Sequence, residues 1–303
     1  MTLVEHRLRV PLRVPLGGRS SRDVVLVGGP AGWGECSPLP GYPADPDRCR
    51  AAAEEAATLG WPPAVRDAVP VNGVVPAVGA DVAARLAAEW LESQGTGGPV
   101  TVKVKVGDEG DLDRVAAVRA ALGPGHRLRV DANGAWDPET ARRRIGLMAA
   151  YDLELVEQPV ATLEELARLR RVVAVPLAAD ECVRSMLDAR RLAALGAADV
   201  VVLKVQAFGG VRPALGVAAA AGVPVVVTSM FETSVGLAAG VALAAALPEL
   251  DYACGLGSAS LLATDVVAEP LVPSEGRLKS RQVVPDPVLL AELALDRSAE
   301  GRG

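Results

Sequence analysis

The sequence predicts a closed (β/α)8 barrel of the (β/α)7β type, joined to a smaller α+β piece. From residue 70 onwards, short apolar strands alternate with helical segments at regular spacing, which is typical of a parallel sheet. The strands are almost wholly apolar, as expected where helices cover their outer face. The chain has 303 residues, of which 50% are hydrophobic. That length accommodates a barrel of about 250 residues and an additional segment.

The first 70 residues have a different pattern. RLRVPLRVPL and RDVVLVGGPAGWGECSP alternate in the manner of antiparallel strands, and residues 51–59 form a short helical run. The Pro-rich segment 264–303 looks irregular and could return to this N-terminal piece. We therefore expect a capping domain made of residues 1–70 with part of 264–303, and a barrel over residues 71–263.

The barrel region supplies eight strands and seven helices. The expected strands are 70–79, 100–107, 127–134, 153–160, 175–182, 198–206, 223–230 and 252–257. The expected helices are 81–91, 112–122, 138–151, 163–171, 184–195, 211–221 and 234–247. Eight strands favour a closed barrel over a doubly wound sheet. No G-x-G-x-x-G motif follows the first strand, which argues against a dinucleotide-binding fold.

Composition excludes several classes of partner and site. The net charge is −6, so neither nucleic acid nor an anionic membrane is expected as the main partner. No apolar stretch reaches the ~18 residues that a membrane span needs. Charged residues interrupt every apolar run at the N-terminus, so a signal peptide is not expected there. Four scattered cysteines fit reduced cytoplasmic thiols. With only His6 and His126, a histidine zinc site is nearly excluded, as is a Ser-His-Asp triad unless His126 serves it.

Ionisable residues stand at the ends of five successive apolar strands. They are Lys103, Lys105, Asp131, Glu157, Asp180, Glu181 and Lys204. Asn133, which is polar but neutral, follows the same strand as Asp131. The carboxyl ends of barrel strands meet at one mouth, where barrel active sites lie. We therefore expect these side chains to share one site.

Three of them predict a metal site. Asp131, Glu157 and Asp180 are each the first strongly polar residue after an apolar run. Converging carboxylates repel one another unless a cation lies between them. Ligation by oxygen alone favours Mg²⁺, with Mn²⁺ as an alternative, over zinc or copper. A helix N-cap would explain any one of these residues, but not three on consecutive strands. Glu181 points the other way from Asp180 and is left as a supporting or structural residue.

The lysines predict proton transfer. Lys103 and Lys105 are two residues apart on a strand, so they point the same way. Their repulsion is expected to lower a lysine pKa from ~10.4 toward ~7–8, which makes a usable base; a chance K-x-K on a solvated strand is the alternative. Lys204 ends the sixth strand, across the barrel from the second. A substrate between Lys105 and Lys204 could lose a proton α to its carboxylate, and the metal would stabilise the enediolate.

These motifs together resemble the enolase superfamily, in the branch of the muconate-lactonising enzymes. The residues that carry the resemblance are K-x-K on the second strand, D-x-N on the third, E-Q-P on the fourth, D-E on the fifth and K on the sixth. It implies a modified barrel with an α+β cap built from both chain ends. The segments GWGECSPLPGY, LKVQAFGGV and TSMFETSVG are most similar to the o-succinylbenzoate synthases of menaquinone biosynthesis.

That resemblance implies a metal-dependent lyase. The family reaction is the syn dehydration of 2-succinyl-6-hydroxy-2,4-cyclohexadiene-1-carboxylate to 2-succinylbenzoate. By the same resemblance, Lys105 removes the α proton and protonates the departing hydroxyl, while Lys103 orients it. Lys204 faces the enediolate by a cation–π contact. The implied substrate contacts are Asn133, Ser229, Met230 and Gly255.

Other functions remain open at this point. N-succinylamino acid racemase, dipeptide epimerase and muconate cycloisomerase of the same superfamily use the same two lysines. The acidic residues expected of an epimerase near the eighth strand are absent from YACGLGSASLL. A non-catalytic metal-binding barrel is a more remote alternative, because lysines on both sides would weaken a purely structural metal site. The expected partner is a small carboxylate, and the oligomeric state stays open, with a monomer compatible with the sequence.

Overall fold

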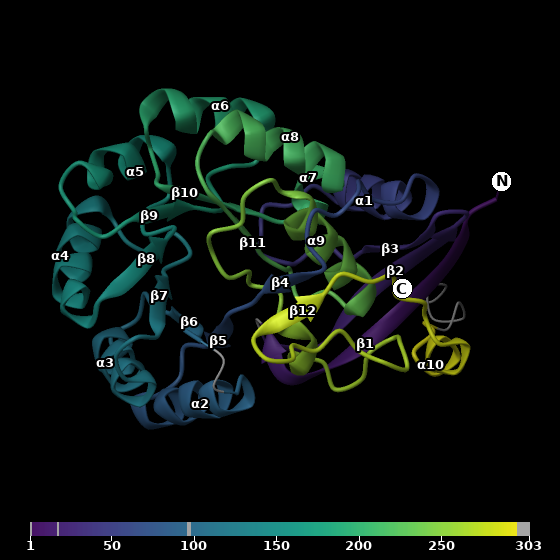
Figure 1. Cartoon of the computed structure of the whole chain (residues 1–303), viewed down its shortest axis with the longest axis horizontal. Helices are drawn as coiled ribbons and strands as arrows, with labels where there is room; N and C mark the ends of the chain where they lie inside the picture. Colours follow the sequence, from purple (N-terminus) through teal and green to yellow (C-terminus); the bar gives the residue numbers. More distant parts are fainter. Residues whose placement is uncertain (1, 17, 96–97, 296–303) are drawn as a thin grey trace, which may run out of the picture.

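The computed structural model describes residues 2–16, 18–95 and 98–295 of the chain. A barrel and an antiparallel sheet lie side by side (Figure 1). The antiparallel part consists of β1 (Val4–Leu16), β2 (Arg19–Gly29), β3 (Gly32–Cys36) and α1 (Pro46–Thr58). Helix α1 begins after Asp45, whose carboxylate accepts from the Asp47 amide. It packs so closely on β3 that a Cβ atom at Gly34 would lie 2.2 Å from the Ala53 carbonyl oxygen, so this contact requires glycine.

The barrel wall is one parallel sheet in the order β11-β10-β9-β8-β7-β6-β5. Its strands are β5 (Gly73–Val75), β6 (Thr101–Lys105), β7 (Arg127–Asp131), β8 (Leu153–Glu157), β9 (Leu177–Ala179), β10 (Val200–Leu203) and β11 (Val225–Val227). The covering helices are α2 (Ala80–Ser93), α3 (Asp111–Leu122), α4 (Pro138–Met148), α5 (Leu163–Arg170), α6 (Met186–Leu195), α8 (Val211–Ala221) and α9 (Ser234–Ala246). The alternation predicted from the sequence is therefore confirmed.

The eighth strand position closes the barrel with very few hydrogen bonds. Cys254 bridges Val71 and Gly255 bridges Thr228, both in parallel fashion. The Cys254 amide donates to the Pro70 carbonyl at 2.8 Å, and the Gly255 amide donates to the Val227 carbonyl at 2.8 Å. The segment expected as a strand at 252–257 thus lies between β11 and the chain before β5. It joins the two edges of the sheet.

Several elements are shorter or more divided than the pattern predicts. The expected strand 70–79 is split into β4 (Ala68–Pro70) and β5, because Val71 and Asn72 turn between two sheets. The expected helix 138–151 is divided into α4 and the short helix η1 (Ala149–Tyr151). Two further short helices, α7 (Val205–Phe208) and η2 (Ser258–Leu261), are not predicted by the apolar periodicity. Both follow barrel strand positions and bend the chain at the mouth.

The C-terminal segment returns to the N-terminal sheet. Strand β12 (Arg277–Lys279) pairs with β4, and α10 (Pro287–Glu292) lies beside β1 (Figure 1). The Arg9 amide donates to the Leu293 carbonyl at 2.9 Å, and the Ala263 amide donates to the Pro11 carbonyl at 2.9 Å. Residues 296–303, which the expected capping segment includes, lie outside the described residues.

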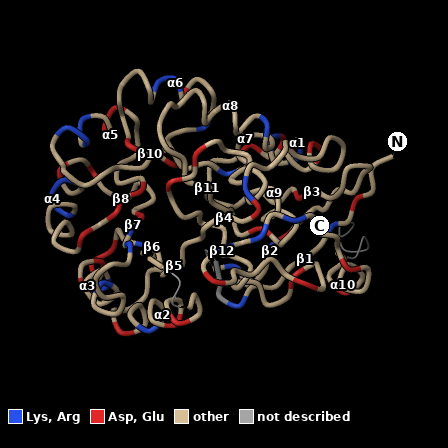
Figure 2. Tube along the Cα trace, in the orientation of Figure 1, with Lys and Arg blue, Asp and Glu red and all other residues tan. Residues whose placement is uncertain are grey.

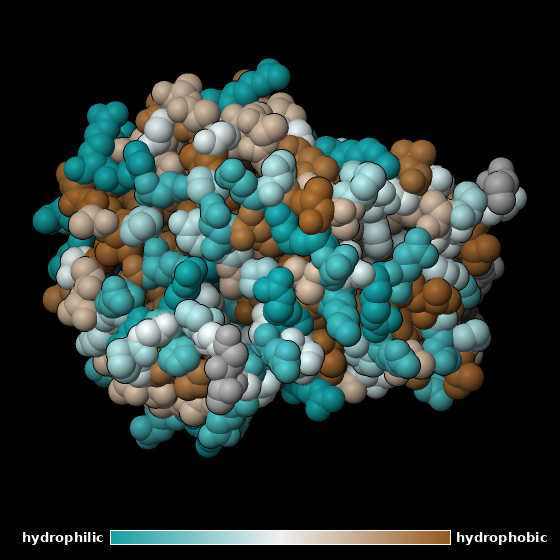
Figure 3. Space-filling model, in the orientation of Figure 1, coloured by the Kyte–Doolittle hydropathy of each residue, from teal (hydrophilic) through white to brown (hydrophobic). Residues whose placement is uncertain are grey.

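Helix α9 shows where the two parts meet. Twelve of its thirteen residues are buried, because it is packed between β11 of the barrel and β3 of the antiparallel sheet. A helix that is apolar on all sides belongs inside a protein. On the outside, Lys and Arg are interspersed with Asp and Glu (Figure 2), and polar and apolar side chains mix (Figure 3). Within the described ranges, no helix is long and apolar enough to span a bilayer.

Candidate active site

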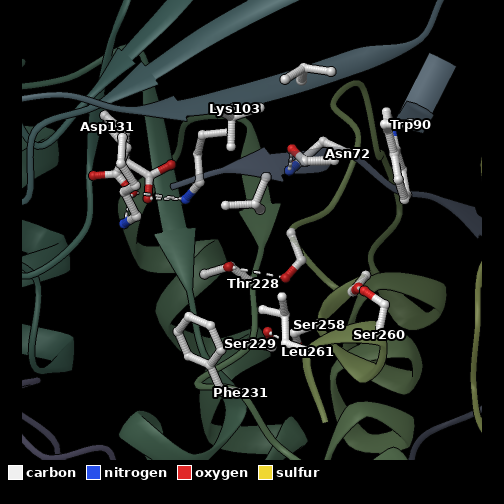
Figure 4. Close-up of a pocket in the computed structure, with 18 of the residues that line it drawn as sticks. Asn72, Trp90, Lys103, Asp131, Thr228, Ser229, Phe231, Ser258, Ser260 and Leu261 are labelled. Carbon is white, nitrogen blue, oxygen red and sulfur yellow. Dashed lines mark hydrogen bonds and ion pairs between the residues drawn. The ribbon is translucent and has the colours of Figure 1, made fainter. Parts of the chain in front are cut away.

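A cavity of about 380 Å³ opens at the carboxyl ends of the barrel strands (Figure 4). Nine of the residues predicted for the site, and the ambiguous Glu181, line it. They are Lys103, Lys105, Asp131, Asn133, Glu157, Asp180, Glu181, Lys204, Ser229 and Gly255. Parallel register explains the convergence, since Lys105 lies opposite Asp131 and Asp131 lies opposite Glu157. Polar residues far apart in the sequence therefore face one space.

The two lysines of β6 have different environments. The side chain of Lys103 is 9% exposed, and its Nζ atom lies 2.8 Å from Glu157 Oε1 and 3.0 Å from Asp131 Oδ2. The side chain of Lys105 is 30% exposed, and its Nζ atom lies 2.6 Å from Asp131 Oδ2 and 2.7 Å from Asn133 Oδ1. Both lysines line the cavity, but Lys103 is the more deeply buried and Lys105 the more exposed.

The expected lowering of a lysine pKa is wrong for Lys103. Burial lowers its pKa, but the carboxylates of Asp131 and Glu157 outweigh burial and hold the pKa above its usual value. The same balance at Asp131 works in the opposite sense: burial raises its pKa, yet the ammonium groups of Lys103 and Lys105 bring the pKa well below its usual range. Burial and the charges of Asp131 and Asp180 raise the pKa of Glu157 to about 7.

Lys204 lies on the opposite side of the cavity. Its Nζ atom is 2.5 Å from both carboxylate oxygens of Asp180 and 4.3 Å from the centre of the Tyr42 ring. The Tyr42 hydroxyl donates to Asp180 Oδ1 at 2.9 Å. Burial lowers the pKa of Lys204, but the carboxylates of Asp180 and Glu157 raise it by more, so the pKa lies above its usual value. Tyr42 comes from the chain after β3 and was not predicted, although it ends the segment GWGECSPLPGY.

Two residues with left-handed backbone shape the strand ends. Asn133 has φ 46° and Gln158 has φ 38°, a region that non-glycine residues seldom adopt outside functional or turn positions. The Asn133 amide donates to Asp131 Oδ1 at 3.1 Å, and Gln158 Oε1 accepts from the Asp180 amide at 2.7 Å. The Asn133 side chain also donates to Glu181 at 2.8 Å, which brings Glu181 into the site.

The turn after β11 contains one predicted residue that does not reach the cavity. Met230 is completely buried, while the next residue, Phe231, lines the cavity and points its ring into it (Figure 4). Phe231 has φ 62°, so the chain changes direction here. As a result, the side chain of Phe231 faces the cavity and that of Met230 does not. Ser229 and Gly255 do line the cavity, and a Cβ atom at Gly255 would lie 2.5 Å from Thr228 Oγ1.

The donor set fits a divalent cation. Asp131, Glu157 and Asp180 are each at most 2% exposed, and burying three carboxylates requires compensating positive charge. In this structure lysine ammonium groups supply it, and the described residues contain no ready-made cluster of three metal-ligating side chains. A divalent ion held by these oxygens would add to this positive charge. Carboxylate oxygens are the ligands that hard divalent ions prefer.

Comparison with known proteins agrees with this geometry. Residues 8–57 match the family described as enolase N-terminal domain-like, and residues 82–286 match enolase C-terminal domain-like. The chain is 54% identical to an o-succinylbenzoate synthase of Thermobifida fusca, over 96% of this chain and 91% of that protein. It is 44% identical to an o-succinylbenzoate synthase of Mycolicibacterium smegmatis, over 95% of this chain and 89% of the relative.

Solved structures match over nearly the whole chain. A 2-chloromuconate cycloisomerase from Rhodococcus opacus is 25% identical with a TM-score of 0.85, covering 98% of this chain and 99% of that one. An N-succinyl Arg/Lys racemase from Bacillus cereus has a TM-score of 0.86 at 20% identity, covering 97% of each chain, which shows a shared fold. The fold is thus the modified TIM barrel with a capping domain, and the chain belongs to the o-succinylbenzoate synthase family of the enolase superfamily.

Proposed function

We propose that this chain is a carbon–oxygen lyase that dehydrates 2-succinyl-6-hydroxy-2,4-cyclohexadiene-1-carboxylate to 2-succinylbenzoate. The observation that carries the proposal is the arrangement of charge around one cavity. Lysines from β6 and from the end of β10 face it from strands four places apart in an eight-position barrel, and carboxylates from the three positions between them lie at its floor. The 54% identity to a synthase over almost the full length supports the choice of reaction.

The metal is part of this proposal. Enzymes of the superfamily use a divalent metal ion, and we assign Asp131, Glu157 and Asp180 as its ligands. We expect Mg²⁺, with Mn²⁺ as a substitute, because the three ligands are hard oxygen donors. When bound, the ion would supply positive charge to the substrate carboxylate and so stabilise the negative charge left by the departing α proton.

Lys105 is the proposed acid and base. It accepts the α proton as a neutral amine, and the resulting ammonium group donates a proton to the leaving hydroxyl. Both groups leave from one face in a syn elimination, so a single lysine can serve both steps. The hydrogen bond to Asn133 holds the Lys105 amine at the cavity.

Lys204 acts from the other face of the substrate. Its pKa is raised by the carboxylates around it, so it stays an ammonium ion. A fixed cation opposite Lys105 stabilises the electron-rich intermediate through charge and cation–π attraction. Ser229 and Gly255 are proposed substrate contacts. Phe231 replaces Met230 in that role, because only Phe231 lines the cavity.

Two coarser features complete the proposal. We place the domain boundaries near residue 70 and residue 263, since the antiparallel sheet ends before β4 and the returning tail begins after η2. We also propose a cytoplasmic enzyme, because Cys36, Cys49, Cys182 and Cys254 are all free thiols.

Racemisation of N-succinylamino acids is the second candidate, and the two facing lysines favour it because racemisation needs a base on each face. The deciding experiment measures kcat/KM of the purified protein with Mg²⁺ on the cyclohexadiene substrate, N-succinylamino acids and dipeptides. We expect dehydration to be the fastest reaction. A racemisation rate far above the dehydration rate would replace the proposed function by the second candidate.

A further inference from the structure

A buried polar cluster joins the cap to the barrel outside the cavity. Its members are Arg22, Glu35, Ser37, Gln206, Glu232 and Thr233, each at most 6% exposed. Three come from the cap and three from the chain after β10 and β11. We call it the cap–barrel cluster. Buried charges persist in proteins only where partners satisfy them, so the hydrogen bonds of this cluster indicate what it holds in place.

Glu35 caps a barrel helix from the other domain. Its carboxylate accepts from the backbone amides of Thr233 and Gly236, each at 3.1 Å, at the N-terminus of α9. The first amides of a helix lack partners within the helix, and the helix dipole favours a negative charge there. A Cβ atom at Gly236 would lie 3.0 Å from the Glu35 carboxyl carbon and 2.5 Å from the Glu232 Cβ atom. Glycine at 236 therefore makes room for both glutamate side chains.

All hydrogen bonds that the structure gives the Glu35 side chain are donated to it. Gln206 Nε2 donates to Ser37 Oγ at 3.2 Å, and the Ser37 hydroxyl then donates to Glu35 Oε1 at 2.5 Å. The Thr233 hydroxyl accepts from the Val235 amide and donates to Glu35. These hydrogen bonds therefore favour the ionised carboxylate, a group that only accepts. A glutamine at 35 would place its NH₂ group against an N–H or O–H donor.

The same cluster holds the turn that carries Phe231. On one side of Phe231, the Met230 amide donates to the Glu232 carboxylate, and the Met230 carbonyl accepts from Arg22 at 2.5 Å. On the other side, Thr233 is bound to Glu35. An aromatic residue at φ 62° is strained and persists only where its surroundings fix it. Here those surroundings include Arg22 and Glu35, both from the cap.

We propose that Glu35 is a positioning residue for the reaction: from the cap, it fixes the turn after β11 and so holds the Phe231 ring as a wall of the cavity. Glu35 does not itself line the cavity, so it acts through this turn. The ring presents an apolar face to the substrate ring, and its placement sets how tightly a cyclic substrate is held. The consequence for catalysis rests on the proposed function, whereas the consequence for the turn does not.

The chain offers a matched control for Glu35. Asp265 is also buried at the N-terminus of α9, where it accepts from the Ser234 amide at 3.1 Å and from the Ser234 hydroxyl at 2.6 Å. It comes from the returning tail and makes no hydrogen bond to the turn at 229–233. Glu35→Gln and Asp265→Asn thus each neutralise one buried carboxylate at the same helix end. Of the two carboxylates, only Glu35 makes hydrogen bonds to the turn.

The first readout is amide hydrogen exchange of residues 228–233 at pH 8, measured by mass spectrometry on the full chain. We expect exchange there to be about tenfold faster in Glu35→Gln, and within about twofold of wild type in Asp265→Asn. Equal protection in Glu35→Gln and wild type, or equal loss in both variants, overturns the proposal. If Glu35→Gln does not fold, as judged by circular dichroism, Glu35→Asp replaces it, because it withdraws the carboxylate from Thr233 by one methylene group; unchanged exchange in that variant overturns the proposal equally.

The second readout is a kinetic double-mutant cycle. We expect Glu35→Gln to lower kcat/KM about tenfold, mainly by raising KM, and to have less than about a twofold effect when Phe231 is already Ala. Equal effects in both backgrounds would show that Glu35 does not act through Phe231. A wild-type protein that does not dehydrate the substrate would refute the proposed function alone, because hydrogen exchange still tests the positioning of the turn.

Discussion

Replacing Tyr42 by Phe removes one hydroxyl group from the edge of the proposed metal site and leaves the aromatic ring in place. In the structure that hydroxyl donates to Asp180 Oδ1 at 2.9 Å, while the ring lies 4.3 Å from Lys204 Nζ. The substitution therefore separates the hydrogen bond from the cation–π contact. If Asp180 is a metal ligand, Tyr42→Phe weakens metal binding and leaves the environment of Lys204 largely unchanged.

The size of the effect follows from the charge and burial of the acceptor. A hydrogen bond to a charged group contributes about 1.5–3 kcal/mol, and partners of metal ligands typically contribute 10–100-fold in affinity. Asp180 is 2% exposed, but Tyr42 is only partly buried, so water can replace part of the lost bond. We therefore expect the lower end, a loss of about tenfold, which corresponds to about 1.4 kcal/mol.

The assay is titration of the metal-free protein with Mn²⁺, followed by electron paramagnetic resonance of the free ion. Tyr151→Phe is the control, because Tyr151 ends η1 on the outside of the barrel and does not line the cavity. We expect the Tyr151→Phe variant to bind Mn²⁺ with the same Kd as the wild-type protein. A Tyr42→Phe variant that binds Mn²⁺ as tightly as the control would refute the assignment of Tyr42 as a partner of a metal ligand.

Three further predictions concern the lysine, the metal and the pH. Lys204→Ala should lower kcat by about 10²–10⁴-fold while Mn²⁺ still raises the melting temperature; near-normal kcat would exclude the proposed role. Chelation should abolish activity and Mg²⁺ should restore it, and activity indifferent to chelation would exclude a catalytic metal. Burial and the Glu232 carboxylate raise the pKa of Glu35 from 4.5 to about 7, against the opposing hydrogen bonds and Arg22. A raised carboxyl pKa stabilises the fold at low pH, so the free energy of unfolding of wild type relative to Glu35→Gln should fall by about 3 kcal/mol as the pH rises from 4.5 to 7. Urea denaturation at several pH values measures this, and a constant difference would contradict it.

The barrel and most of the charged site could be predicted because their signals are local. A charged residue directly after a run of buried aliphatic residues, as at Lys204, is unfavourable unless a site uses it. The same signal recurs on successive strands, and parallel strands end at one mouth of the barrel. The sequence therefore predicts that Asp131, Glu157 and Asp180 lie close together. The fold class followed from the alternation of apolar strands and helices alone.

What could not be predicted depends on long-range packing. Tyr42 reaches Asp180 across 138 positions of sequence, and only the docking of the cap brings them together. The choice between Met230 and Phe231 depends on one left-handed residue, which periodicity does not reveal. The direction of the Lys103 pKa shift also required distances, because its carboxylate partners lie within 3.0 Å and outweigh the repulsion that the K-x-K spacing indicates.

The most direct test of the account is the rate at which wild-type protein and Lys105→Ala form 2-succinylbenzoate from the cyclohexadiene substrate, followed by absorbance at saturating Mg²⁺. We predict that wild type forms the product and that Lys105→Ala is slower by several orders of magnitude, while both bind Mn²⁺ with similar affinity. Comparable rates of product formation in the two proteins would contradict the account, because no other described residue is assigned to remove the α proton.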